Sequence, residues 1–268
     1  MRAIEPTHAL LPTLAESLRN PAFWGYSTWL DIVTRYRKSK LGLLWMLAPP
    51  SLYIFGMGYF FARIQAIDPF VFMPHLGLGY LLFRLISMVL IESTSVLPTH
   101  SGHILDGRVR LTDFVLKVLV RALFYLLSSL PVLLPVVVLS PDTHVGGTLL
   151  ALGGLVLMLL NMMWLAGVVS LFGARFPDTH EFMGSIFVLG FVVTPILWYP
   201  SAAPAGTLHG LVMRLNPAFH LIEVVRAPLL GEPVETASLV FCAVAALLGW
   251  SLWIWAYRRY HRFVALWV

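Results

Sequence analysis

The densest group of reactive side chains is a cluster of four cations directly before an uncharged run. The cluster comprises Arg35, Arg37, Lys38 and Lys40, and from Leu41 to the end of the run at residue 61 only tyrosine is ionisable. Cations beside an anionic membrane leaflet are each attracted to it by about 1 kcal/mol. They also hold their end of a span in the cytoplasm. The residues alone leave an anion-binding role and an anchoring role equally open.

Other polar groups form no known catalytic pattern. His100, His103 and Asp106 are three apart, but no fourth metal ligand accompanies them, and we expect no metal. The sequence contains no G-x-x-x-x-G-K-[ST], no G-x-S-x-G and no H-E-x-x-H. Every Asp and Glu lies at or beyond the end of a predicted span, whereas a proton-driven carrier needs acids inside the membrane. We therefore expect a partner ATPase to supply the energy for any uphill transport.

The elements that must position these groups are membrane-spanning helices. Hydrophobic residues make up 59% of the 268 residues, charged residues 12%, and mean hydropathy is +0.82, unlike a soluble domain. We predict an all-α integral membrane protein: a cytoplasmic N-terminus with an amphipathic interfacial helix (1–40), a six-span domain (41–257) and a cytoplasmic C-terminus (258–268). The spans are predicted at about 41–61, 70–91, 120–140, 147–173, 182–199 and 236–257.

Several residues predict local features inside these runs. Paired prolines at 49 and 50 should kink the first span, since neither can donate a backbone hydrogen bond. Arg84 is costly in lipid and lies eight residues before Glu92, on the same side of the helix. This spacing favours an ion pair between them, and a direct role of Arg84 in substrate binding is the alternative. The fourth span should approach other helices closely at its small residues, Gly153, Gly154 and Gly167.

The long segment between the fifth and sixth spans should contain a short helix. Asn216 and Pro217 form a capped helix start, and Pro228 and Gly231 should stop the helix after residue 227. We expect it at the outer surface or re-entering partway. With both termini inside, 13 of the 18 Lys and Arg residues fall in cytoplasmic segments and only three outside, Arg63, Arg214 and Arg226. This asymmetry favours an even number of spans.

Three motifs point to a family. The first is Arg35-Tyr36-Arg37-Lys38-Ser39-Lys40-Leu41-Gly42, followed by Trp45 and Pro49. The second is Asn216-Pro217 with His220, Glu223, Arg226 and Gly231, and the third is Thr194-Pro195 followed by Trp198-Tyr199. Together with the order of spans, they resemble the permease subunits of ATP-binding-cassette type 2 exporters of O-antigen, capsule and teichoic acid. The chain departs from that family at Leu111-Thr112, where similar permeases often carry a proline after the basic residues.

The resemblance implies a homodimer in the bacterial inner membrane, with both termini cytoplasmic, that exports a lipid-linked polysaccharide, most of all O-antigen. Two separate nucleotide-binding subunits would bind ATP and Mg²⁺, leaving no cofactor in this chain. Membrane lipids are expected partners and nucleic acid is not. The cations Arg35, Arg37, Lys38 and Lys40 would receive the phosphate of the lipid carrier.

The remaining roles follow the predicted topology. Sugars dock on aromatic faces, so the candidates for a glycan channel are Tyr53, Phe60, Trp164, Trp198 and Tyr199. The cytoplasmic candidates for coupling to the ATPase are His103, Asp106, Arg108, Arg110, Arg175 and Asp178. The candidates for an outer gate are Asn216, His220, Glu223 and Arg226.

Other functions stay open at this level. Capsule or teichoic acid export would use the same machinery as O-antigen export. A type 2 exporter of a lipid or drug would share the topology but have a narrow, apolar lumen. A membrane-embedded transferase acting on lipid-linked sugars would need a polar catalytic cluster, for which His75, or His220 with Glu223, is the nearest approach.

Overall fold

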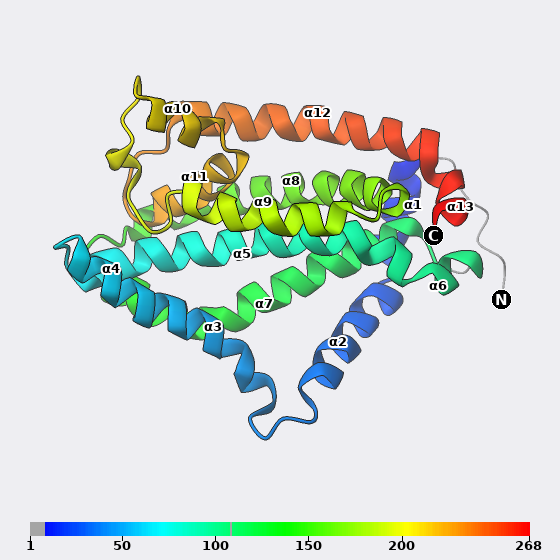
Figure 1. Ribbon diagram of the computed structural model, residues 1–268, viewed down its shortest axis with the longest axis horizontal. Coiled ribbons are helices and arrows are strands. Elements are labelled where there is room, and N and C mark those ends of the chain that lie inside the picture. Colours follow the sequence, from blue (N-terminus) through cyan, green and yellow to red (C-terminus); the bar gives the residue numbers. More distant parts are fainter. Residues whose placement is uncertain (1–8, 108) are drawn as a thin grey trace.

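Four long helices lie side by side and form the body of the protein (Figure 1). The computed structural model describes residues 9–107 and 109–268, and within these ranges the regular structure is entirely helical. The long helices are α5 (Pro69–Thr99), α7 (Leu111–Leu139), α8 (Thr148–Arg175) and α12 (Thr236–Tyr260). Helix α5 is central, since it packs against both α7 and α8. The prediction of an all-α membrane protein is confirmed.

The first span is a succession of short helical pieces. It comprises η1 (Gly42–Leu47), α3 (Ala48–Ser51), η2 (Leu52–Met57, a π-helix) and α4 (Gly58–Ile64). The 3₁₀ helix η1 changes to the α-helix α3 at Ala48, so Pro49 and Pro50 lie in the first turn of α3, where their missing N–H groups have no partner to lose. The kink expected at these prolines stays a prediction. After α4 a short turn leads into α5. Asp68 caps the start of α5, because its side chain accepts a hydrogen bond from the Phe70 amide (2.8 Å).

Short elements gather at the two ends of the bundle. Helices α1 (Leu10–Arg19), α6 (Ser101–Leu105) and α13 (Val264–Trp267), with η5 (His261–Phe263), lie at the end that carries the C-terminus (Figure 1). We call this the cytoplasmic end, following the predicted orientation. The opposite, outer end carries η3 (Val145–Gly147), η4 (Pro200–Ala202) and α10 (Leu208–Leu215). Helix α2 (Ala22–Tyr36) leaves the bundle obliquely before the first span begins.

Two helices, α9 (Thr179–Val193) and α11 (Pro217–Leu229), come in from opposite ends beside α5 and α8. Helix α9 stops six residues short of the predicted limit of 199, since Thr194 precedes a proline and is extended. Asn216 caps α11 as expected, accepting a bond from the Ala218 amide (3.0 Å). The predicted stop after residue 227 is wrong by two residues, because Pro228 lies in the last turn of α11 and the helix continues to Leu229.

Glycines in α8 allow the close contacts that the sequence predicted. A Cβ at Gly154 would lie 2.0 Å from the Val224 carbonyl oxygen of α11, and one at Gly167 would lie 2.0 Å from the Trp253 indole of α12. The Val224 carbonyl has no helical partner, since residue 228 is proline. Gly153 was also expected to make a contact, but its Cβ position is open.

Within the described residues, five helical stretches are long and apolar enough to cross a membrane, and α9 is a shorter apolar helix. Buried residues make up 67% of the most apolar window of α5 but only 22% in the first span and in the last. Those two spans therefore keep broad apolar faces for lipid or for another chain. The count of six crossings stays a prediction, because α9 has only 15 residues.

Candidate functional site

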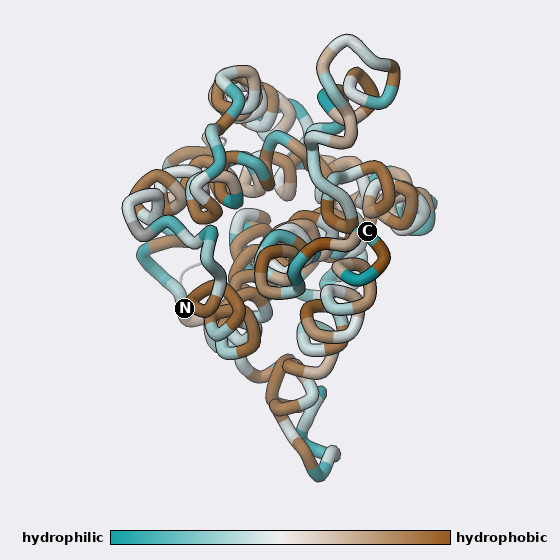
Figure 2. The backbone as a smooth tube through the Cα atoms, turned by 90° about the vertical axis from the view of Figure 1, so that its left-hand side faces the viewer, coloured by the Kyte–Doolittle hydropathy of each residue, from teal (hydrophilic) through white to brown (hydrophobic). Residues whose placement is uncertain are grey.

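The cation cluster lies at the tip of a projecting hairpin between α2 and the first span. Figure 2 shows this hairpin extending from the bundle with a hydrophilic tip. Arg35, Arg37, Lys38 and Lys40 are all exposed, and none takes part in an ion pair within the described part of the chain. Four uncompensated cations are thus presented beside apolar side chains of the first span, where Trp45 is half exposed.

Helix α2 is fastened to the bundle by an ion-pair network. Lys117 of α7, whose side chain is only 5% exposed, donates to Asp31 of α2 (2.9 Å). Arg121 of α7 contacts the same Asp31 carboxylate and also donates to Glu92 of α5 (2.6 Å). The network positions the hairpin, since α2 leads directly into it.

His100 completes this network at the end of α5. Its Nδ1 donates to the Val96 carbonyl (2.8 Å), so that Nε2 can accept from the Lys117 ammonium (3.0 Å). Burial lowers the pKa of His100, and the Lys117 cation acts in the same direction. The neutral imidazole is therefore the form that fits beside Lys117.

The predicted ion pair between Arg84 and Glu92 is wrong. Glu92 binds Arg121 instead, and Arg84 has no acidic partner among the described residues. The physical reason is distance, because eight residues of helix separate their Cα atoms by about 12 Å along the axis. Arg121 reaches Glu92 from the neighbouring helix.

Most of the predicted coupling residues lie together at the cytoplasmic end. His103 is in α6, with its ring 5.9 Å from that of Phe23 in α2. Arg110 binds Glu16 of α1 (2.7 Å), and Arg175 ends α8. The turns after α6 and before α9 carry Asp106 and Asp178. Arg108 lies outside the described residues. This end is a polar surface built from α1, α6 and the ends of α8 and α9.

The five predicted channel aromatics do not form one stack. Tyr53 stacks on Tyr80 of α5 (centroids 4.0 Å), and Phe60 is 58% exposed. Trp164 packs between α8 and α12, where a Cβ at Gly249 would lie 2.0 Å from its indole. The last two aromatics, Trp198 and Tyr199, lie at the outer end of α5. There the Trp198 carbonyl and the Tyr199 ring both contact His75. Trp164 is a packing residue by this geometry.

The predicted gate residues form a buried polar cluster at the outer end. Arg226 is fully buried and binds Glu223 one turn earlier in α11 (2.8 Å). Its Nη1 also donates to the Pro195 carbonyl (2.5 Å), just after α9. The Asn216 amide donates to Thr194 (2.8 Å) in the same segment. These bonds hold the segment after α9 against α11.

His220 and His75 fix the two sides of this cluster. His220 Nε2 donates to the Arg214 carbonyl and Nδ1 accepts from Ser238 at the start of α12, both at 2.8 Å. His75 Nε2 lies 3.1 Å from the Trp198 carbonyl and 3.3 Å from Arg226 Nη1. Both nitrogens of His220 and one oxygen of Glu223 take part in these bonds, which join α11 to α12 and to the segment after α9. The His75 Nδ1 atom is buried without a hydrogen-bond partner.

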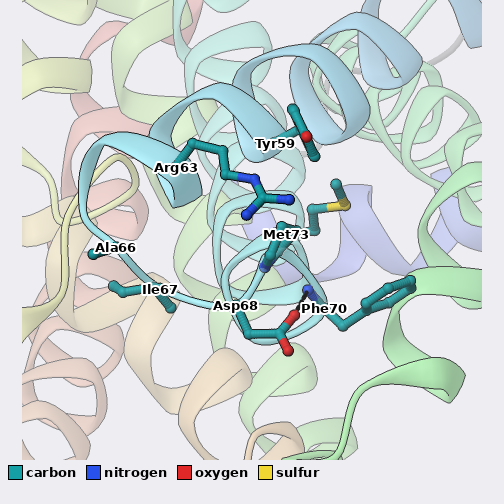
Figure 3. Close-up of a pocket in the computed structure, with 8 residues that line it drawn as sticks. Tyr59, Arg63, Ala66, Ile67, Asp68, Phe70 and Met73 are labelled. Carbon is teal, nitrogen blue, oxygen red and sulfur yellow. Dashed lines mark hydrogen bonds between the residues drawn. The ribbon is translucent and has the colours of Figure 1, made fainter.

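Two hollows open at the outer end. The larger, of about 810 Å³, lies between α4 and the start of α5 (Figure 3). Its lining includes Arg63, whose guanidinium lies 5.1 Å from the Tyr59 ring centroid. The smaller, of about 210 Å³, is lined by Asp142, Tyr199 and Glu232 among others. Burial raises the pKa of the Glu232 carboxyl group. The Arg226 cation lowers that pKa, whereas the Glu223 and Asp142 carboxylates raise it further.

Comparison with known proteins agrees with this architecture. The family model described as ABC-2 type transporter matches residues 24–230, which is more than half of the chain. The chain belongs to this family. No curated protein matches the sequence. An ABC-2 permease is the membrane-embedded transport subunit of an ATP-driven transporter, and the ATPase activity resides in a partner.

Sequence reasoning missed the partners of several singled-out residues. The sequence indicated His75 only as a candidate for a catalytic cluster, and it did not indicate that Asp31, Lys117 and Arg121 contact one another. A weak signal existed for the last two, because Lys117 and Arg121 are four apart and share one face of α7. Nothing in the sequence places Asp31 beside them, since it lies in another helix, α2.

Proposed function

We propose that this ABC-2 permease translocates a lipid-linked polysaccharide, most of all O-antigen, from the cytoplasm to the periplasm. The observation that carries the proposal is the projecting hairpin, which presents four unpaired cations beside an exposed apolar span. A lipid-linked glycan has an anionic phosphate at the junction of lipid and sugar, which is the chemistry such a hairpin would bind. Arg35 and Arg37 can each fork onto two phosphate oxygens, whereas lysine cannot.

The transporter would be a homodimer in the inner membrane with two ATPase subunits. The exposed faces of the first and last spans support a second copy as neighbour. The cytoplasmic end, with α6 and the turn before α9, would dock the ATPase. Cysteines replacing Asp106 and Asp178 should crosslink to the ATPase subunit, and failure at both positions in an assembled complex would reject this docking surface.

The orientation has its own test. Both termini are expected in the cytoplasm, so reporter fusions after Val268 should be active only in the cytoplasm. A periplasmic signal from that fusion would contradict the orientation and with it the inner-leaflet position of the hairpin.

The substrate is tested by charge-conserving changes in the hairpin. Arg35→Lys with Arg37→Lys keeps the positive charge and should keep orientation and abundance, yet lower the surface glycan. The matched control is Lys38→Arg with Lys40→Arg, which should export normally. Wild-type export by the first variant would leave the cluster as an anchor only.

The cargo is identified from the lipid-linked glycan that accumulates in cells that lack this permease. Intracellular accumulation of a lipid-linked O-antigen is expected. Accumulation of a capsular or teichoic acid precursor would name those glycans instead. Export of a lipid or drug with normal surface glycan would overturn the proposal. The geometry favours transport over the transferase alternative, because both nitrogens of His220 and one oxygen of Glu223 are already bound within the buried cluster.

A further inference from the structure

Arg84 is an unneutralised cation halfway along the central helix. It lies midway between Pro69 and Thr99, the ends of α5, in a span that is apolar enough to cross a membrane. It forms no ion pair with any residue that the structure describes. Its Nη1 is buried without a hydrogen-bond partner. Ionisable residues at this depth ordinarily pair or serve a function, and the unpaired Nη1 leaves the guanidinium a donor for an anionic ligand.

Two tyrosines interact with the guanidinium. The Tyr125 ring of α7 lies 5.5 Å from the guanidinium carbon, within cation–π range. Tyr80, one turn earlier on the same face of α5, also interacts with Arg84. Tyr53 of the first span stacks on Tyr80 (4.0 Å), so the first span passes beside the guanidinium. The rings hold Arg84 without neutralising it, because none of them is an anion.

The crevice beside Arg84 is narrow in this conformation. It has a volume of about 10 Å³, and Arg84, Met88, Tyr125 and Ser129 are among its lining residues. That is room for about one water, which is too little for a phosphate. A phosphate therefore fits beside the guanidinium only when the helices that line the crevice move apart.

A line of contacts joins Arg84 to the hairpin. The Tyr125 hydroxyl lies 3.5 Å from that of Tyr36, which is the last residue of α2 and stands between Arg35 and Arg37. The nearest acid along α5 is Glu92, which Arg121 already binds. An anion moving from the hairpin to Arg84 would meet aromatic and cationic groups.

We propose that Arg84 is a second phosphate-binding residue, which receives the phosphate of the lipid-linked substrate after the hairpin and holds it halfway across the membrane. This assignment rests on the proposed function. The guanidinium offers forked donors to two phosphate oxygens, and its buried, unpaired Nη1 is one of those donors. The hairpin captures from the inner leaflet, whereas Arg84 acts within the span.

The test uses the complete complex of permease and ATPase subunits in lipid nanodiscs. The probes are a polyprenyl diphosphate, the uncharged polyprenol of the same length and inorganic pyrophosphate, with retained ligand measured by native mass spectrometry. Wild type should retain the polyprenyl diphosphate well above the polyprenol. Arg84→Gln should lower that retention about tenfold, the loss of one charged hydrogen bond, and leave polyprenol retention unchanged.

The matched control is Arg63→Gln, which removes an arginine that also lies over a tyrosine ring, but at the outer end of the first span. Its retention of polyprenyl diphosphate should stay within about twofold of wild type. Arg84→Lys keeps the charge and should lie between wild type and Arg84→Gln. Complex recovery by size exclusion is measured for every variant.

The outcomes separate this inference from the proposed function. Equal retention of polyprenyl diphosphate by Arg84→Gln and wild type would overturn the role of Arg84 and leave the proposed function standing. If wild type does not prefer the diphosphate to the polyprenol, the proposed function fails and this assignment fails with it. Binding of pyrophosphate at comparable affinity would support a free anion as the ligand and overturn the lipid-linked one. Loss of the dimer in both Arg84 variants would assign the arginine to a carboxylate of a second copy.

Discussion

Replacing Arg226 with methionine should strongly destabilise the outer end of the protein. Arg226 is fully buried, and the Glu223 side chain that it binds is 5% exposed. The change removes that ion pair and the bond to the Pro195 carbonyl, and leaves the Glu223 carboxylate buried without its cation. Breaking a buried pair from one side costs about 3–5 kcal/mol. For a protein of this size that lowers the melting temperature by on the order of 10 °C.

The assay is the fraction of detergent-solubilised complex that stays monodisperse after heating. Arg226→Met with Glu223→Gln removes both charges and should recover most of the loss, since a neutral amide is far less costly to bury than a carboxylate. The matched control is Arg214→Met, whose partner Glu235 is 33% exposed and whose loss should cost no more than about 1 kcal/mol. If Arg226→Met melts with wild type, or if the double variant is no more stable than the single one, the buried pair does not hold α11 in place.

Three further predictions address other contacts. Gly154→Ala should destabilise the protein by about 1–3 kcal/mol, because the new Cβ meets the Val224 carbonyl of α11. The control, Gly153→Ala, has open space at its Cβ and should be neutral or slightly stabilising in the same melting assay. The reverse ranking would contradict the α8–α11 contact. Asp31→Asn should leave the buried Lys117 ammonium with neutral partners only, the new amide and His100. Because Asp31 is 45% exposed, we expect a loss of about 1–2 kcal/mol and faster proteolysis of α2. Unchanged proteolysis would refute the role of Asp31 in holding α2 on the bundle. Glu232→Gln should stabilise the protein at neutral pH, because burial raises the pKa of Glu232 in the folded state and folding therefore disfavours its carboxylate. The gain in stability should disappear as the pH falls to 4.5, the ordinary pKa of glutamate. A gain that persists at that pH would rule out this titration as its cause.

The sequence predicted helix positions better than helix partners. The apolar runs locate α8 and α12 within a few residues, whereas α5 continues eight residues beyond its predicted end at 91 and α7 begins nine residues before its predicted start at 120. The extra turns of α5 carry polar side chains such as Glu92 and Ser93, which lie beyond the predicted end of the span. They stay helical because α7 and α8 pack against the same stretch and satisfy those side chains, as Arg121 does for Glu92.

By itself the sequence determined that the chain is helical, which runs can cross a membrane and where the unpaired cations of the hairpin lie. It could do so because a bilayer leaves backbone groups no partner except their own helix, so apolar length alone identifies a span. The tertiary structure alone decided that Glu92 binds Arg121, that Arg226 joins α11 to the segment after α9, and that Arg84 lies over a tyrosine ring with no acidic partner among the described residues. Those pairings depend on which helix faces come together, and that is set by packing between residues far apart in the chain, such as Gly154 against Val224.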